Sequence, residues 1–271
     1  MKSFIWQVHR SMSSTTLHVH MLTSIRVNSS HRITLCNPKT RNSLSVTMLQ
    51  HLINEIKNAG KNQSLKSIVI NGNGPIFSAG HNLKELIDMK IQQKVFSLAT
   101  ELMNAMLDCP IPIITAIDGL AAASGCQLVA ASDIAICTNR SSFSTPGVNL
   151  GLFCSTPGIP LSRCIPKKVA SYMLFTGESI NAEEALRNGL VSKVVHPKEL
   201  DDEIDKLTLL IDQKSREVIT HGKTFFNQQI DVDIKTAYKN GEKAMLENLQ
   251  LDDCKEGLQS FIEKRKPNWS N

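Results

Sequence analysis

Hydrophobic residues recur at helical and strand spacings along the chain, and their order indicates an α/β fold. Apolar positions three and four residues apart predict a helix from Ser43 or Ser45 to about Lys61. Short apolar runs predict strands over 66–71 and 111–117, each followed by a turn that contains glycine, and a third strand over 133–138. A helix is expected over 124–132. This alternation of strand and helix favours parallel strands joined by right-handed crossovers.

Beyond residue 180 the pattern becomes helical. Asn181, followed three residues later by Glu184, is typical of a helix N-terminus, and Gly189 is expected to end that helix. Four further helices are predicted near 200–211, 215–228, 233–249 and 253–264. We therefore divide the chain into an α/β core at residues 31–195 and a helical C-terminal region at residues 196–271. That region either packs against its own core or serves subunit assembly.

The distribution of charge argues against a nucleic-acid partner. The 271 residues include 30 Lys and Arg against 25 Asp and Glu, so the formal net charge is +5. No acidic residue precedes Glu55, whereas six basic residues do, so the rest of the chain has 24 basic and 25 acidic side chains. Nucleic-acid binding needs a basic face with aromatic side chains for stacking, and aromatic residues make up only 5% of this chain.

The first 30 residues have the composition of a targeting segment. They contain three basic residues, seven serines and no acidic residue, and they lack the continuous apolar run of a secretory signal. Such a segment is typical of a mitochondrial transit peptide, which predicts a location in the mitochondrial matrix. The alternative is an N-terminal tail without a targeting role.

Neither a membrane span nor a metal site is predicted. The longest uncharged run, residues 141–162, is interrupted by three prolines and three glycines, which a spanning helix tolerates poorly. The seven cysteines lack the paired spacing of zinc ligands, and several lie within apolar runs. We expect them to be small buried hydrophobic side chains in a reducing compartment.

Two loops rich in small residues carry the candidate chemistry. The first covers residues 77–86, follows a predicted strand and opens a helix. The second covers residues 118–127 and runs into a helix through a stretch almost without side chains. Free N–H groups at such a helix start favour a negatively charged oxygen. Two loops of this kind can aim two N–H donors at one carbonyl oxygen and form an oxyanion hole.

Short motifs between residues 37 and 265 accompany these loops. They are Asn37-Pro38-Lys39, Asn42-Ser43-Leu44, the segment Phe77–Leu86, Ile117-Asp118-Gly119, Gly125-Cys126-Gln127-Leu128, Ser132-Asp133-Ile134, Phe143-Ser144-Thr145-Pro146, Thr176-Gly177-Glu178, and Glu256-Gly257 with Phe261 and Glu263-Lys264-Arg265. Together they resemble the crotonase superfamily, also called the enoyl-CoA hydratase/isomerase family, over residues 31–271.

The resemblance implies a fold, a ligand and an assembly. The fold would be a crotonase-like spiral of ββα turns with a C-terminal helical assembly region, forming a homo-trimer or a hexamer built as a dimer of trimers. The ligand would be an acyl-CoA thioester from fatty acid or lipid metabolism. Coenzyme A would enter as part of that ligand, and no separate cofactor is expected.

The resemblance also assigns roles to individual residues. The two oxyanion N–H donors fall on His81 and Ser124. The residues expected to contact CoA share exposed or loop positions; they are Lys39, Ala79, His81, Lys84, Phe261 and Lys264. Of these, Phe261 and Lys264 match a pair on the last helix that often reaches the CoA of a neighbouring subunit.

The sequence departs from the family at the catalytic positions. Hydratases of the family use two glutamates, and these positions fall on Gln127 and Gly147. A third position, which holds a carboxylate in some relatives, falls on Ser155. None of the three residues can act as a general base, and general acid–base catalysis contributes about 10²–10⁴-fold per group. We expect a site that binds and polarises a thioester but lacks the usual proton transfer.

Several interpretations of such a site stay open. They differ in whether the chain turns over an acyl-CoA substrate at all. The chain can be a non-catalytic acyl-CoA binder or regulatory subunit, or an enzyme of altered chemistry such as decarboxylation or weak hydration. Candidate proton donors for such chemistry are His81, Thr145 and Asn149. Hydrolysis by Ser124 is a further reading, but a serine nucleophile needs an adjacent base, and no matching histidine follows it in the sequence.

Overall fold

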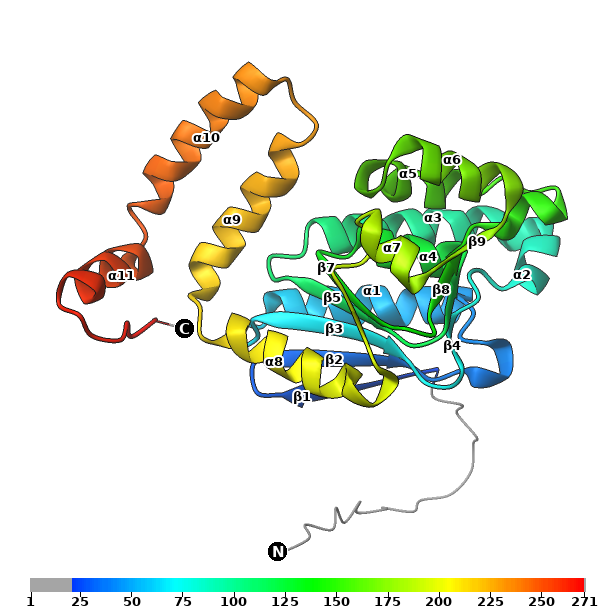
Figure 1. Ribbon diagram of the computed structural model, residues 1–271, viewed down its shortest axis with the longest axis horizontal. Helices are drawn as coiled ribbons and strands as arrows, with labels where there is room; N and C mark the ends of the chain where they lie inside the picture. The colour runs from blue at the N-terminus through cyan, green and yellow to red at the C-terminus, as the bar shows by residue number, and fades with distance from the viewer. Residues whose placement is uncertain (1–20, 271) are drawn as a thin grey trace, which may run out of the picture.

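The computed structural model describes residues 21–270 and contains two β-sheets surrounded by helices (Figure 1). The larger sheet has six strands in the order β1-β2-β3-β5-β7-β10. Its strands are β1 (Leu22–Val27), β2 (Ser30–Leu35), β3 (Ser67–Gly72), β5 (Ile113–Ile117), β7 (Ile134–Thr138) and β10 (Lys193–Val195). From β2 to β10 all neighbours are parallel, as the sequence predicts, whereas β1 and β2 form an antiparallel pair.

The smaller sheet was not predicted. It has four short strands in the order β4-β6-β8-β9. These are β4 (Ile76–Ser78), β6 (Leu120–Ala122), β8 (Ser142–Ser144) and β9 (Ser179–Asn181), of which only β9 is antiparallel to its neighbour. Each of the pairs β3–β4, β5–β6 and β7–β8 adds one strand to each sheet before the chain enters helices. The result is a spiral of ββα turns.

Helices cover both faces of the larger sheet. On one face lie α1 (Val46–Lys61), α2 (Leu83–Ile87), α3 (Met89–Leu107) and α4 (Ser124–Ala131), followed by α5 (Ser155–Cys164), α6 (Lys167–Thr176) and α7 (Ala182–Arg187). Ser45 caps α1 by accepting a hydrogen bond from the Met48 N–H, and Asn181 and Glu184 form the expected capping box of α7. The segments of α3, α5 and α6 were not predicted as helices.

The opposite face of this sheet is covered by α8 (Leu200–Asp212). Leu200 and Ile204 of α8 pack on Val69, Ile114 and Ile136 of the sheet. The first helix of the predicted C-terminal region thus packs against the core, which is one of the two roles expected for that region. The predicted leader also overlaps the fold: β1 lies within residues 1–30 and pairs along its whole length with β2. Residues 1–20, the rest of that leader, lie outside the described residues.

The last three helices form an arm that projects from the core (Figure 1). They are α9 (Arg216–Gln229), α10 (Ile234–Asn248) and α11 (Asp252–Ile262). Buried polar contacts attach the base of the arm: the Arg216 guanidinium donates to the carbonyl oxygens of Leu65 and Gly60, both at 2.9 Å, and to Gln63. Further along α9, Lys223 Nζ lies 2.6 Å from Asp133 Oδ2, at the start of β7.

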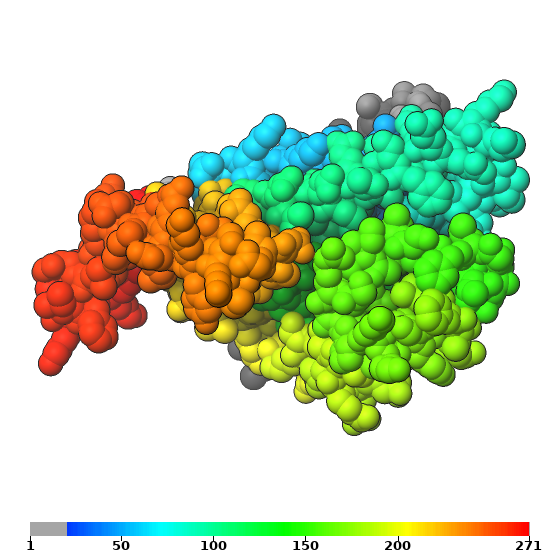
Figure 2. Space-filling view, turned by 90° about the horizontal axis from the view of Figure 1, so that it is seen from above, coloured from blue at the N-terminus to red at the C-terminus, as the bar shows by residue number. Residues whose placement is uncertain are grey.

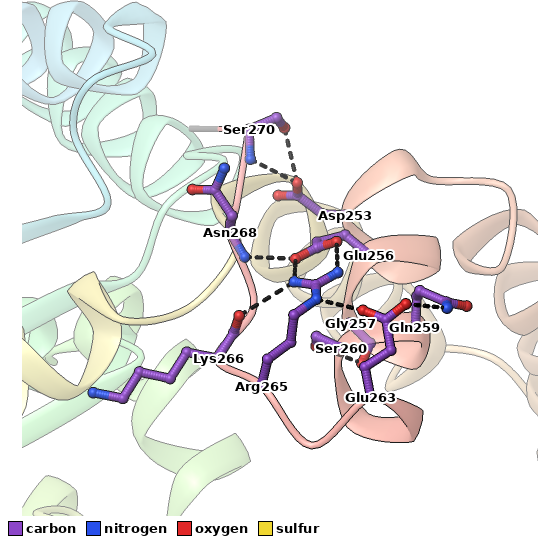
Figure 3. A network of polar contacts seen from close by, with 10 residues as sticks. All are labelled: Asp253, Glu256, Gly257, Gln259, Ser260, Glu263, Arg265, Lys266, Asn268 and Ser270. Atoms are coloured by element: carbon purple, nitrogen blue, oxygen red, sulfur yellow. Dashed lines mark hydrogen bonds and ion pairs between the residues drawn. The ribbon is translucent and has the colours of Figure 1, made fainter.

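The C-terminal tail folds back on α11 through a polar network (Figure 3). Glu256 accepts hydrogen bonds from the Arg265 guanidinium at 2.6 and 2.8 Å and from the Asn268 N–H at 2.7 Å. Asp253 accepts from the N–H and the hydroxyl of Ser270, both at 2.8 Å. The chain reverses at Lys264, whose φ is +53°, so these contacts hold the position of that residue.

Candidate functional site

The candidate site lies at the carboxyl edge of the smaller sheet. Strands β4, β6 and β8 are parallel neighbours, with Ser78 opposite Ala121 and Ala122 opposite Ser144. The chain leaves these strands toward His81, Ser124 and Thr145, respectively. Because the carboxyl ends of parallel strands meet at one edge, the two predicted loops and the segment at Thr145 come together there, as binding sites do in other α/β sheets.

The two predicted loops touch so closely that only glycine fits at their contacts. A Cβ at Gly80 would lie 2.8 Å from the Ala123 Cβ and 3.2 Å from the Ser124 nitrogen, and Gly80 has a φ of +89°. A Cβ at Gly125 would lie 2.8 Å from the Ser78 Cβ. Contacts of this length exclude a side chain, so both glycines are needed to bring the Ser124 N–H beside the loop that ends at His81.

Two backbone N–H groups are left free at this contact. Ser124 is the first residue of α4, where an N–H has no partner within the helix. Within residues 21–270, neither the Ser124 N–H nor the His81 N–H donates a backbone hydrogen bond elsewhere. Ala123, the residue before Ser124, has a φ of +49°, which is unusual for a residue with a side chain. This conformation turns the chain sharply into α4. Two N–H groups without a backbone acceptor therefore lie where the two loops meet.

Asn42 holds the first loop in place, a role that the sequence analysis missed. Its buried side-chain amide donates to the carbonyl oxygens of Asn73 and Ile76, both at 3.0 Å, and its Oδ1 accepts from the Asn37 N–H. The Ser78 hydroxyl in turn donates to the Asn42 carbonyl at 2.8 Å. An asparagine followed by a turn gives no signal for such distant partners, because they lie more than 30 residues away.

The His81 side chain packs into the protein interior. Its ring makes an edge-to-face contact with Phe96 of α3, with centroids 5.7 Å apart, and Nδ1 lies 3.4 Å from the Leu44 carbonyl oxygen. Burial lowers the pKa of His81, and the weaker opposing effect of the Leu44 carbonyl does not reverse it. The imidazole is therefore neutral at neutral pH. Among the described residues its Nε2 has no hydrogen-bond partner.

The structure places Ser124 and His81 on adjacent loops without a hydrogen bond between their side chains. The Ser124 Oγ is buried and, like His81 Nε2, has no partner among residues 21–270. A serine nucleophile requires a base within hydrogen-bond reach. Hydrolysis by Ser124 therefore has no support in this geometry, and the backbone N–H is the group of Ser124 that faces the other loop.

Gln127 and Gly147, on which the resemblance places the two glutamates of hydratases, differ in their surroundings. Gln127 is buried on α4, one helical turn after Ser124. Gly147 is also buried, and a Cβ there would overlap the Leu152 carbonyl oxygen and lie 2.8 Å from the Cys154 sulfur. A side chain at position 147 thus requires movement of the following loop. The sequence predicts that Gly147 lacks a carboxylate, but not that its neighbours exclude one.

The other two proton-donor candidates, Thr145 and Asn149, and the third family position, Ser155, differ in their exposure to solvent. Thr145 is fully buried at the carboxyl edge of β8, and its hydroxyl has no partner within residues 21–270. Asn149 is exposed, with its side chain against Gly177. Ser155 is exposed at the first turn of α5. Of these three residues, only Thr145 lies in the interior at the edge where the two loops meet.

The residues expected to contact CoA fall into two groups. Lys39, Ala79 and Lys84 lie near the site: the Ala79 N–H donates to the Arg41 carbonyl at 3.0 Å, which brings the exposed turn that carries Lys39 beside this loop, and Lys84 is exposed on α2. Phe261 and Lys264 lie at the end of the arm, and Phe261 is 84% exposed. One chain does not bring these two residues to its own site (Figure 1).

The cysteines near the site behave as apolar side chains. Cys126 and Cys154 are buried, and desolvation raises the pKa of each thiol. A thiol of this kind is a poor nucleophile at neutral pH, because the thiolate is the reactive form. Residues 21–270 contain no cluster of His, Cys, Asp and Glu suited to a metal ion, and none of their helices is long and apolar enough to cross a membrane.

Sequence comparisons identify relatives along nearly the whole chain. The family model described as enoyl-CoA hydratase/isomerase matches residues 26–271. Enoyl-CoA hydratase domain-containing protein 3, mitochondrial, of Mus musculus is 48% identical over 254 residues, which cover 92% of this chain and 85% of that protein. The short-chain-enoyl-CoA hydratase of Clostridium acetobutylicum is 31% identical over 244 residues, covering 86% of this chain and 91% of that enzyme.

Solved structures share the fold. The crystal structure of human enoyl coenzyme A hydratase domain-containing protein 3 superposes with a TM-score of 0.90 at 45% identity, covering 92% of this chain and all of that one. An enoyl-CoA hydratase from Mycobacterium smegmatis superposes with a TM-score of 0.89 at 38% identity, covering 93% and 99% of the two chains. The spiral of ββα turns, the two apposed loops and the family match agree, and the chain belongs to the enoyl-CoA hydratase/isomerase family.

Proposed function

We propose that this chain binds acyl-CoA thioesters and polarises their carbonyl group without the acid–base pair that adds water in hydratases. The observation that supports this most strongly is the pair of free N–H groups at His81 and Ser124. They are held together by loops that admit only glycine at positions 80 and 125. Two N–H donors fixed in a water-poor site stabilise the negative charge that develops on a thioester oxygen.

The chemistry next to these donors supports binding more than hydration. Gln127 offers an amide with no useful pKa, and the contacts of Gly147 exclude a side chain. Hydration by this chain would thus be weak. Decarboxylation of a malonyl-type thioester is a second candidate. It breaks a C–C bond, leaves the electron pair as an enolate that the two N–H groups stabilise, and needs a proton donor but no base.

The CoA part of the ligand would lie along the exposed edge formed by Lys39, Ala79 and Lys84. In a homo-trimer or hexamer, Phe261 and Lys264 would reach the CoA of a neighbouring subunit, which accounts for their distance from the site of their own chain. Because the Mus musculus relative is named as a mitochondrial protein, we place this chain in the mitochondrial matrix, with a role in fatty acid or lipid metabolism.

Two substitutions at position 124 test the proposed donor. Ser124→Pro removes the backbone N–H at the first helical position, where proline is tolerated, whereas Ser124→Ala removes only the hydroxyl. We expect calorimetry to show a loss of butyryl-CoA affinity of about fivefold for Ser124→Pro, since a hydrogen bond contributes about 1 kcal/mol. Ser124→Ala should bind as the wild type does.

Binding of free CoA serves as the folding control for both variants, because the CoA contacts proposed above do not involve the Ser124 N–H. Unchanged butyryl-CoA affinity in Ser124→Pro, with CoA binding retained, would show that this N–H does not contact the thioester. Absence of butyryl-CoA binding by the wild-type chain would refute the proposed function itself.

A further inference from the structure

A groove of about 570 Å³ lies between the core and the arm, walled by four helices. Its volume falls within the range of small-molecule sites, roughly 300–1,000 Å³. The lining is mainly apolar, with Met103 and Leu107 from α3, Ile159 from α5, and Phe226 and Ile230 from α9. In the space-filling view the arm and the α5–α6 region stand on either side of this hollow (Figure 2).

This groove starts beside the proposed thioester site. Gln127 lies on its wall, one helical turn after the Ser124 donor, and Ala130 and Ala131 continue the same wall toward the end of α4. At the other side α3 leads from Phe96, which contacts the His81 ring, to Met103 and Leu107. Gln127 is therefore the residue shared by the groove and the proposed thioester site, and a group attached to a carbonyl at the two N–H donors would enter the groove past it.

The outer wall of the groove is α9, which polar contacts fasten to the core at three levels. Lys223 Nζ pairs with Asp133 at 2.6 Å, and Asn227 donates to the Leu107 carbonyl at 3.1 Å. Farther along, Arg163 of α5 lies 3.9 Å from Asp231. Between these contacts, Phe226 and Ile230 are 60% and 53% exposed and face the apolar side chains of the core.

We propose that this groove takes the hydrocarbon tail of a medium-chain acyl-CoA, with about eight carbons. The inference rests on the proposed function. From Ser124 to Ala131 α4 rises about 10 Å, and a staggered chain of about eight carbons, with C–C bonds near 1.5 Å, spans a similar length. The two basic side chains at the groove are both paired with carboxylates: Lys223 with Asp133, and Arg163 with Asp231. The groove therefore suits an uncharged tail.

A chain-length series on the full-length protein tests the inference. We expect the affinity measured by calorimetry to rise from butyryl-CoA to octanoyl-CoA by up to about fourfold per methylene. It should then stop rising, so that palmitoyl-CoA binds no tighter than octanoyl-CoA. Equal affinity for all three ligands would overturn this inference and leave the proposed function standing. Binding of none of them would refute the proposed function.

Filling the groove provides the second arm of the test. Ala130→Phe should lower octanoyl-CoA affinity at least tenfold and leave butyryl-CoA affinity unchanged, which also shows that the variant is folded. Ala244→Phe, the same substitution on α10 outside the groove, is the matched control. The competing occupant is an apolar helix of a second copy of this chain. Loss of oligomers in Ala130→Phe, without a change in octanoyl-CoA affinity, would assign the groove to that contact and overturn the inference.

Discussion

At the scale of single residues, the site depends on side chains that are absent or that act only as supports. Gly80 and Gly125 let two loops touch, and Asn42 links the backbone at Asn37, Asn73 and Ile76, just before the first loop. The groups that would contact a thioester are main-chain N–H groups, which substitution of most side chains leaves intact. The proposed oxyanion hole would therefore not depend on the side chains at positions 127 and 147.

Gln127→Glu should introduce a general base next to the oxyanion donors. Burial at this position would raise the pKa of a carboxyl group toward neutrality, the range in which a base is most effective. We expect crotonyl-CoA hydration, followed by the loss of enoyl absorbance, to increase on the order of 10²-fold over the wild-type rate. Gln127→Met is the matched control and should gain nothing. An equal rate in all three proteins would show that the amide does not occupy the position of a catalytic group.

His81 should make the stability of the protein depend on pH. Burial lowers its pKa in the folded state below the unfolded value of 6.5, so the folded state binds fewer protons. The stabilisation is present above pH 6.5 and is lost as the pH falls through the folded pKa. The slope is at most about 1.4 kcal/mol per pH unit.

Urea unfolding at pH 7.5 and pH 5 measures this dependence. In His81→Leu, the difference in unfolding free energy between the two pH values should be smaller than in the wild type. The same pH dependence in both proteins would contradict a buried, neutral imidazole at this position.

The positions of His81 and Ser124 could be predicted from the sequence because family motifs mark both loops. The closure of position 147 could not. It depends on how residues 147–154 turn back on themselves, which brings the Leu152 carbonyl and the Cys154 sulfur against Gly147. No periodicity or composition in that segment reports such a contact.

At the scale of secondary structure, long amphipathic helices and buried strands were predictable and short strands were not. The helix α1 has a full set of apolar positions on one face, and β3 and β5 are continuous apolar runs. Strands β4, β6, β8 and β9 have only three residues each, too few to show a period of two. Strand β1 lies in a basic, serine-rich stretch whose composition suggested a leader.

The base of the arm should depend on Arg216. Its buried guanidinium donates to Leu65, Gly60 and Gln63, and burial lowers the pKa of this group. Arg216→Met would leave these acceptors without their donor. We expect a loss of about 3 kcal/mol in the free energy of unfolding.

Chemical denaturation measures this loss, with Arg187→Met as the control. Arg187 is exposed at the end of α7, so its substitution should change the free energy of unfolding by less than about 0.5 kcal/mol. Similar values for the two variants would mean that the Arg216 contacts do not stabilise the fold.

At the scale of the whole molecule, the arm exposes apolar side chains that a monomer would leave in water. Phe261 and Ile262 at its end are 84% and 73% exposed. The network in Figure 3 holds the reversal at Lys264, and the Arg265 guanidinium lowers the pKa of Glu256 to about 2, so this ion pair persists in mild acid. A fixed arm with an apolar end is suited to contact with another subunit.

We therefore expect a trimer or hexamer in solution, which sedimentation velocity can measure. Lys264→Ala should leave this assembly intact and weaken CoA binding several-fold, since the proposed CoA contact crosses the subunit boundary. A monomer at micromolar concentration would contradict the assembly. Unchanged CoA affinity in Lys264→Ala would contradict the contact between subunits.

The overall architecture followed from the sequence, whereas the start of the larger sheet and the packing of α8 became clear only in the structure. The larger sheet begins at Leu22, within the stretch predicted as a leader, and α8 covers a face of that sheet although it was assigned to the C-terminal region. Apolar periodicity predicts that a helix such as α8 buries one face. It does not say whether the buried face packs against the core or against another subunit.

The central claim is that this family member keeps the thioester site and lacks the hydratase acid–base pair. The most direct test measures crotonyl-CoA binding and crotonyl-CoA hydration in the same preparation of the wild-type chain. We predict clear binding with a hydration rate at least about 10²-fold below that of an enoyl-CoA hydratase carrying both glutamates. Hydration at the rate of that enzyme would contradict the account, because another group would then be performing the proton transfer.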